Sequence, residues 1–385
     1  MSGAPGTAEA RATAAPATVA SASLAVRRLS RETWQRLAAA GESAGGSAGD
    51  SRSLLGAIGY GGPAGAAPLL LHVDAPLLGD GGPQIDAWSC IDAPGALSRG
   101  RCGSVDWRGD GRWLVGSAAV DNDDGSDVDG GGPGTEALAE RLYGDVFATL
   151  GAGGCRHLLR VWHYLPSINA DEHGLERYRR FNVGRQRAFA AADRTQPGHA
   201  PAACALGTRR GPLRLAFLAG RDAPLAVENP RQVSAYRYPA VYGPTSPTFS
   251  RAALADAGGG RVALFVSGTA SIVGHESRHA GDVEAQAREA LANVGAVVAA
   301  AQRRTSAGFD PAALSLVVYV RHAGDAGRVC AVIDATLGAA STAARTAVYL
   351  QADICRAELL VEIEAHAVAP GKLHADLHAD GMAPV

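Results

Sequence analysis

Apolar runs of strand length and longer segments with helical spacing follow one another along most of the chain. Leu138, Leu142, Val146 and Leu150 recur at helical spacing before a pair of glycines, which predicts a helix over 136–154. A strand over 157–165, a helix over 174–192 and further apolar runs ending at 220 follow. The same order then returns as a strand over 261–274, a helix over 282–302, a strand over 313–322, a helix over 326–338 and strands over 344–354 and 359–369.

This repeated order predicts two related α+β modules, each a sheet covered by helices on one face. Residues 1–24 form an Ala/Pro/Thr/Ser-rich tail that we expect to be disordered. We expect an N-terminal domain over 25–225 that includes a degenerate first module, and a catalytic second module over 226–370. A short C-terminal tail, 371–385, completes the predicted organisation.

Two carboxylates interrupt the last apolar run, "AELLVEIEAHA". Side chains alternate along a strand, so Glu362 and Glu364 share one face while the apolar residues share the other. Aligning "LRLAFLA" with "LVEIEA" places Ala216 opposite Glu362 and Leu218 opposite Glu364. This alignment favours one active and one structural copy, and the alternative is a pair of solvated or salt-bridged edge carboxylates.

Composition removes several classes of function. The net charge of −2 and the lack of basic runs argue against a nucleic-acid partner. No apolar stretch approaches the roughly 20 residues of a membrane span, and the N-terminal residues do not resemble a secretory signal. Six cysteines without CxxC spacing indicate reduced thiols and a cytoplasmic location.

One motif suggests a metal site but lies in the wrong context. "HESRH", residues 275–279, matches HExxH, which binds zinc when both histidines lie on one face of a helix. Here it follows "SIVG" and precedes Asp282, a good N-cap for the next helix. We therefore predict a loop at this motif and no metal site.

Several stretches resemble known families. "PAVYGPTSPTFSRAA", "FVSGTAS" and "VEIEA" resemble the YjgF-like reactive-intermediate deaminase fold. More specifically, the second half is similar to the chorismatase family in "ENPRQVSAYRYPAVYGPTSPTFSRA", "SGTASIVGHESRHAGD" and "ADICRAELLVEIEA". "WHYLPSINADEHGLERYRRFNVGR" carries the same resemblance in the first half. The resemblance implies two YjgF-like modules and cofactor-free cleavage of chorismate with release of pyruvate.

The resemblance also implies which residues act. Glu362 would be the catalytic acid, and the Gly268 and Cys355 pair is the pattern of members that form 3-hydroxybenzoate. An acid that protonates the enol ether needs a raised pKa, which burial and the like charge of Glu364 would provide. The carboxylates of chorismate need cations, for which we expect Arg345, at the start of the strand before Glu362, then Arg251 and Arg185. We also expect Tyr242 to bind the substrate.

Three other functions stay open from the sequence. A hydrolytic chorismatase would release a dihydroxycyclohexadiene carboxylate, and a relaxed enzyme would form 4-hydroxybenzoate beside the 3-isomer. A non-catalytic or imine-deaminating YjgF-like protein would bind small carboxylates without cleaving chorismate. Since single YjgF-like modules pack as trimers and this chain holds an internal copy, we expect a monomer or a homotrimer.

Overall fold

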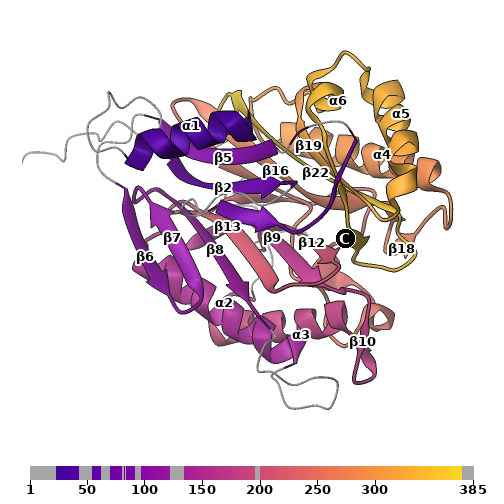
Figure 1. Ribbon diagram of the computed structural model, residues 1–385, viewed down its shortest axis with the longest axis horizontal. Helices are drawn as coiled ribbons and strands as arrows, with labels where there is room; N and C mark the ends of the chain where they lie inside the picture. The colour runs from indigo at the N-terminus through magenta and orange to yellow at the C-terminus, as the bar shows by residue number, and fades with distance from the viewer. Residues whose placement is uncertain are drawn as a thin grey trace, which may run out of the picture.

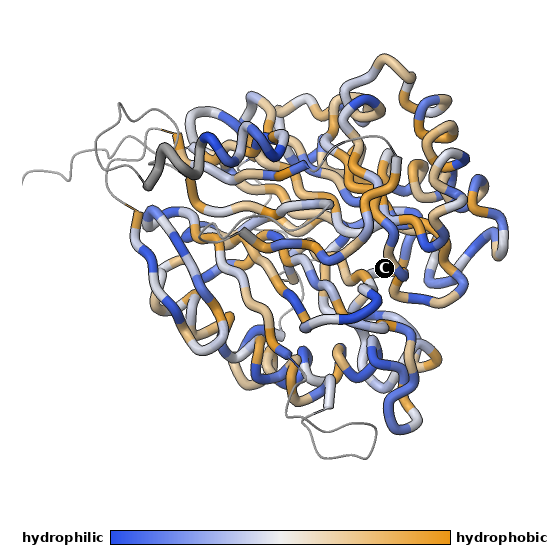
Figure 2. Tube along the Cα trace, viewed as in Figure 1, coloured by the Kyte–Doolittle hydropathy of each residue, from blue (hydrophilic) through white to orange (hydrophobic). Residues whose placement is uncertain are grey.

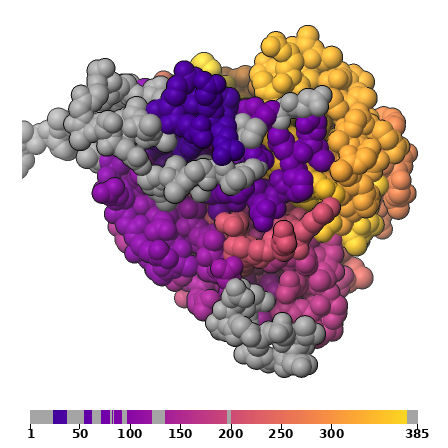
Figure 3. Space-filling view, viewed as in Figure 1, coloured from indigo at the N-terminus to yellow at the C-terminus, as the bar shows by residue number. Residues whose placement is uncertain are grey.

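The computed structural model describes residues 23–42, 54–61, 70–79, 82, 84–91, 97–121, 134–195 and 200–374, but not the side chains of 37–42 and 70. Three sheets make up most of it, and helices cover their outer faces (Figure 1). Each part of the chain takes its own sector of the surface, as the colours in Figure 3 show. None of the helices in these ranges has the length and apolar character needed to cross a membrane.

The C-terminal module is a seven-stranded sheet with the strand order β14-β15-β16-β22-β19-β20-β4. Strands β19 and β20 are parallel, whereas β22 lies antiparallel between β16 and β19. Asp282 caps α4 by accepting bonds from Glu284 N and Ala285 N, as its sequence position predicts. The elements are β14 (Leu225–Val227), β15 (Ala252–Gly258), β16 (Arg261–Ala270), β17 (Ile272–Val273), β18 (Glu276–Ser277), α4 (Val283–Gln302), β19 (Ser315–Val320), α5 (Ala326–Leu337), α6 (Thr342–Thr346), β20 (Val348–Gln351), β21 (Asp353–Ile354) and β22 (Val361–Pro370).

The preceding segment folds into a second sheet of the same design. Its order, β21-β12-β9-β13-β8-β7-β6, follows the C-terminal order when β7, β8, β13, β9 and β12 replace β15, β16, β22, β19 and β20. The predicted duplication is therefore confirmed. The elements are β6 (Ser98–Cys102), β7 (Val105–Gly109), β8 (Trp113–Val120), α2 (Thr135–Ala152), β9 (His157–Pro166), β10 (Asp171–Glu172), β11 (Leu175–Glu176), α3 (Arg177–Ala191), β12 (Ala202–Thr208) and β13 (Leu213–Gly220).

A third copy of the strand order lies at the N-terminal end and was not evident from the sequence. The sheet β1-β5-β2-β3 corresponds to β16-β22-β19-β20, including the parallel last pair. Its elements are β1 (Ser23–Ser30), α1 (Arg31–Glu42), β2 (Leu54–Tyr60), β3 (Leu70–Val73) and β5 (Gln84–Ile91), while β4 (Leu77–Leu78) joins the C-terminal sheet. Strand β1 begins at Ser23 and so includes the last two residues of the expected tail, of which Leu24 is buried.

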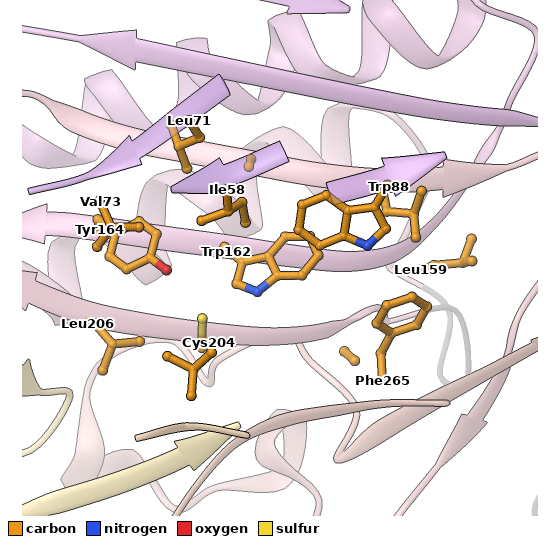
Figure 4. Close-up of a cluster of buried hydrophobic side chains, with 14 of the residues drawn as sticks. Ile58, Leu71, Val73, Trp88, Leu159, Trp162, Tyr164, Cys204, Leu206 and Phe265 are labelled. Carbon is orange, nitrogen blue, oxygen red and sulfur yellow. The ribbon is translucent and has the colours of Figure 1, made fainter. Parts of the chain in front are cut away.

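The three sheets turn their inner faces toward one shared core. Trp88 of β5 lies 5.1 Å from Trp162 of β9, and Phe265 of β16 belongs to the same cluster (Figure 4). Helices pack on the outer faces through buried apolar side chains, and Figure 2 shows that these helices also carry hydrophilic residues. Burial on both sides explains why many of these strands read as nearly continuous apolar runs.

The strand registers relate one tyrosine in each copy. Tyr319 pairs with Glu362, Tyr164 pairs with Arg214, and Tyr60 pairs with Gln84. The position of Glu362 therefore corresponds to Arg214 in the first module, two residues before the Ala216 expected from the hydrophobic pattern. Side chains alternate along a strand, so shifting the alignment of two strands by two residues leaves every side chain on the same face. The hydrophobic pattern therefore could not distinguish Ala216 from Arg214 as the counterpart of Glu362.

Candidate functional site

Glu362 and Glu364 share the inner face of β22, and both are buried, with 3% and 4% of their surfaces exposed. The edge-carboxylate alternative therefore does not describe them. Glu362 borders a narrow cavity of about 60 Å³ between the C-terminal sheet and the start of α3 in the first module. The cavity is lined by Glu176, Tyr178, Arg179, Gln232, Tyr238, Tyr242, Pro247, Phe249, Arg251, Gly268, Ala270, Ile272, Cys355, Arg356 and Glu362.

A bulge in β16 brings Gly268 against the carboxyl group of Glu362. The β16–β22 pairing shifts between Val266 and Thr269, so Ser267 and Gly268 leave the regular ladder. Ser267 Oγ donates to Ser250 O at 2.6 Å and accepts from Ala203 N at 2.8 Å, which ties the bulge to the first module. A Cβ on residue 268 would overlap Glu362 Oε1, so only glycine leaves the carboxyl group where it is.

Burial and a neighbouring carboxylate make Glu362 a weak acid. Desolvation raises its pKa to about 8, and the charge of Glu364 adds to this effect, while Arg160 and Arg251 oppose it. Glu364 itself is held in an ion pair with Arg160 of β9 and accepts a hydrogen bond from Tyr319 Oη at 3.1 Å. Glu362 is thus a neutral proton donor at pH 7, beside a carboxylate that is already paired.

Two arginines that line this cavity, Arg251 and Arg356, each have a buried N–H group without a hydrogen-bond partner among the described residues. Arg251 donates through Nη2 to Val233 O and to Tyr238 Oη, both at 2.7 Å, and its Nε has no partner among the described residues. Arg356 donates through Nη1 to His275 O at 2.9 Å, and its buried Nη2 is similarly unpaired. The guanidinium of Arg356 also lies 3.9 Å from the centre of the Tyr242 ring. Such groups are suited to hold a carboxylate.

Cys355 lines the cavity as a neutral thiol. Burial raises its pKa to about 12, and the nearby Glu362 carboxyl adds to the shift. The thiol can therefore donate a weak hydrogen bond or shape the cavity, but it is not a nucleophilic thiolate at neutral pH. The structure places Cys355, Gly268, Arg251 and Tyr242 in one cavity with Glu362, as the sequence predicts for all five.

Arg185 lies outside the cavity, in the interior of the first module. It is 2% exposed and donates to Asn182 Oδ1 at 2.9 Å within α3. Beside it, Tyr143 Oη donates to His163 Nε2 at 2.7 Å, because His163 Nδ1–H donates to Cys204 O at 2.6 Å. Arg185 therefore supports the packing behind the cavity.

Arg345 also lies elsewhere. Sequence spacing placed it at the start of a strand, but residues 342–346 form the short helix α6, capped by a bond from Ala344 N to Ser341 Oγ at 3.1 Å. Its helix lines a separate hollow, away from Glu362. The structure thus does not bring Arg345 together with the candidate acid.

Among the lining residues that the sequence did not single out, four carry a phenol or a guanidinium group, namely Tyr178, Arg179, Tyr238 and Arg356. All four lie inside the stretches that carry the family resemblance, next to residues that were selected. An Arg or Tyr in a loop has no periodicity that separates a cavity residue from a surface one, so only the fold distinguishes them.

The "HESRH" motif lies in the hairpin β17–β18 and the turn after it, so the predicted loop is confirmed. His279 Nε2 lies 3.1 Å from Glu289 Oε2 of α4, whereas His275 contacts Tyr242. The two histidines therefore have separate partners. Within the described ranges, no cluster of three or more His, Cys, Asp or Glu side chains is arranged to bind a metal ion.

The repeated strand order and the buried acid where two copies meet define a protein assembled from repeated α+β modules. Residues 87–219 match the family model "Chorismatase FkbO/Hyg5-like, N-terminal". A 3-hydroxybenzoate synthase of Streptomyces hygroscopicus is 42% identical over 241 residues, which cover 60% of this chain and 68% of that protein. A chorismatase of Streptomyces rapamycinicus is 40% identical over 230 residues, covering 58% and 67%.

A crystal structure of a chorismatase superposes with a TM-score of 0.72 at 28% identity, covering 90% of this chain and 99% of the other. The structural match therefore extends over both modules. The chain belongs to the chorismatase family.

Proposed function

We propose that this enzyme cleaves chorismate to 3-hydroxybenzoate and pyruvate, with Glu362 as the catalytic acid. The observation that carries the proposal is a buried carboxyl group with a pKa of about 8 in a cavity that also holds unpaired arginine N–H groups. A neutral acid and cations for a dianion are the two requirements of this reaction. Family membership, and the name of the Streptomyces hygroscopicus relative, support the same product.

Arg251 and Arg356 would each hold one carboxylate of chorismate. Their unpaired Nε and Nη2 atoms are the available donors, and Arg179 lines the same cavity. Because the cavity is narrow, the tyrosine rings that line it must move aside to admit the cyclohexadiene. Arg251→Ala would then raise KM for chorismate, and an unchanged kcat/KM would remove this arginine from the site.

The reaction would begin when Glu362 transfers its proton to the terminal methylene of the enolpyruvyl group. The resulting oxocarbenium-like centre weakens the bond between the ether oxygen and the ring. The ring hydroxyl oxygen then attacks the ring carbon, whose bond to pyruvate breaks, and the hydroxyl proton returns to the Glu362 carboxylate. The epoxide-like intermediate opens at its other carbon, its oxygen takes up one proton and that carbon loses one, which gives 3-hydroxybenzoate. No water is consumed, because the atoms of chorismate equal those of the two products.

Gly268 and Cys355 would direct the outcome toward this internal displacement. Gly268 allows the acid to lie against the bulge, which a side chain would prevent. The neutral Cys355 thiol borders the cavity without adding charge and leaves the ring hydroxyl as the available nucleophile. Exclusion of water from a narrow cavity favours the same course.

The test is incubation of the purified protein with chorismate and no added cofactor, with products separated by chromatography and identified by mass. Equal amounts of 3-hydroxybenzoate and pyruvate are expected from the wild type and neither from Glu362→Gln. A matched control, Glu140→Gln on the exposed side of α2, should keep full activity. A diene diol product would show that Gly268 and Cys355 do not direct the reaction toward 3-hydroxybenzoate. Absence of turnover by the wild type would refute the catalytic role of Glu362.

A further inference from the structure

A second cavity, of about 710 Å³, lies between the C-terminal module and the N-terminal sheet. Its volume is within the range of small-molecule sites. The N-terminal part contributes the end of β1, the start of β5 and strand β4, and the C-terminal module contributes β20, α6 and the start of α5. It is lined by Arg28, Leu77, Leu78, Gly79, Gly82, Gln84, Ser315, Ala326, Gly327, Cys330, Thr342, Ala344, Arg345, Thr346, Ala347, Val348 and Tyr349.

This cavity and the Glu362 cavity lie at equivalent positions of the repeat. The Glu362 cavity lies between the C-terminal and the first module, and the second cavity lies between the N-terminal sheet and the C-terminal module. The Glu362 cavity lies where the end of β16 and the start of β22 face the start of α3. Here the end of β1 and the start of β5 face the start of α5, and these three elements are the counterparts in the strand order. Gln84 pairs with Tyr60 as Glu362 pairs with Tyr319, so Gln84 is the residue at the position of the acid.

The lining has the chemistry of a carboxylate site without an acid. An amide at residue 84 donates hydrogen bonds but has no proton to transfer at neutral pH. Arg345 is exposed, and its guanidinium makes no hydrogen bond or ion pair with the residues that the structure describes. The buried Tyr349 hydroxyl lacks a hydrogen-bond partner within the same ranges. Leu77, Leu78 and Val348 supply apolar surface between these groups.

Arg28 forms a fixed wall of the cavity. Its Nε and Nη2 each donate to Asp86 at 2.8 Å, and its Nη1 donates to Leu316 O and Thr346 O. Each nitrogen of the Arg28 guanidinium thus has a partner, and the bond to Thr346 O ties it to the residue next to Arg345. Of the two arginines among the described lining residues, Arg345 is therefore the one whose guanidinium is unpaired.

We propose that this second cavity binds a small ring-containing monocarboxylate, of the size of a hydroxybenzoate, without converting it. Arg345 holds the carboxylate, the Tyr349 hydroxyl and the Gln84 amide meet polar substituents, and the leucines cover the ring. The site is separate from the Glu362 cavity, so its occupancy does not depend on the reaction proposed above. One chain would then carry a catalytic and a non-catalytic version of the same site.

Cys330 gives a direct readout, because this half-buried thiol lines the cavity. We would follow thiol modification by a chromogenic disulfide in the Glu362→Gln background, which removes turnover from the assay. The Cys330→Ser variant identifies the part of the signal that belongs to this thiol. Benzoate and 3-hydroxybenzoate are the probes, and pyruvate tests whether the ring is required.

We expect both ring carboxylates to slow modification of Cys330 in a saturable way. Arg345→Ala should raise the apparent Kd about tenfold or more, as expected for loss of a charged hydrogen bond. The control Arg303→Ala removes another exposed arginine, at the end of α4, and should leave protection unchanged. Absence of protection, equal protection in Arg345→Ala, or equal protection by pyruvate would overturn the proposal.

Discussion

Replacing Glu362 by glutamine should abolish activity and at the same time stabilise the fold. The pKa of this carboxyl group is about 8 in the folded protein, against an ordinary value of 4.5. Between these two pH values the unfolded chain has lost the proton while the folded chain keeps it. Stability therefore falls as the pH rises through this window, with each pKa unit corresponding to about 1.4 kcal/mol.

At pH 7 the neutral buried carboxyl costs the folded state about 3 kcal/mol relative to the ionised group in the unfolded chain. Glutamine has nearly the same shape and carries no ionisable proton, so most of this cost disappears. At pH 4.5 or below the two proteins should differ little. The free energy of unfolding of Glu362→Gln relative to the wild type should therefore increase as the pH rises. A change in packing alone would give the same difference at every pH.

Urea unfolding of the wild type and Glu362→Gln at pH 5 and pH 7.5 measures this difference, provided that unfolding is reversible and two-state. The exposed Glu140→Gln variant provides the control, with the same chemical change and little expected effect at either pH. A second readout is the pH profile of the wild type, whose kcat/KM should fall as the pH rises through about 8. Equal stabilities at both pH values, or a variant with wild-type activity, would refute the reasoning.

The remaining predictions concern the surroundings of the acid. Gly268→Ala should lower kcat by about tenfold or more, because the new methyl group displaces the acid from the bulge, whereas Gly295→Ala, in open space on α4, should be neutral or stabilising by about 0.5–1 kcal/mol. Cys355→Ser should preserve the fold but change the ratio of 3-hydroxybenzoate to other ring products, measured by chromatography, and an unchanged ratio would show that the thiol does not direct the outcome. Arg160→Met should destabilise the protein by about 3–5 kcal/mol by leaving Glu364 buried and unpaired, and a melting temperature equal to that of the wild type would contradict the ion pair as drawn.

The sequence predicted the elements of the two modules because their periodicities are strong. The helices at 135–152 and 283–302, and the strand that holds Glu362, lie where the apolar spacing indicates. The N-terminal copy was missed because its β2, β3 and β5 are separated by glycine-rich segments and it has no helix pattern after β2 to complete the repeat. The N-terminal sheet resembles the other two copies in its strand order, whereas its amino-acid sequence does not reveal the likeness.

The candidate site was predictable where one side chain alone carries the chemistry. Carboxylates in an apolar strand are a local signal that singled out Glu362 and Glu364, and the family resemblance then selected Glu362 as the acid. Arg345 shows the limit of such reasoning, because the 5-residue helix α6 stands where the sequence indicates a strand and places the guanidinium at another cavity. Arg356 lies next to Cys355 in the same family-like stretch, but only the fold shows that it lines the cavity.

Fusion of three sheets into one chain explains how the copies diverged. In a symmetric trimer one substitution would appear in every site, whereas here the equivalent positions are free to hold Glu362, Arg214 and Gln84. The surrounding polar framework changed less, since Tyr319 donates to Glu364 as Tyr60 donates to Asp86 at 3.2 Å. Each of these carboxylates is in turn paired with an arginine, Glu364 with Arg160 and Asp86 with Arg28. The carboxylate–arginine pairs are thus retained in two copies of the shared core. The residues that differ between the copies lie near the ends of the strands, where the cavities are.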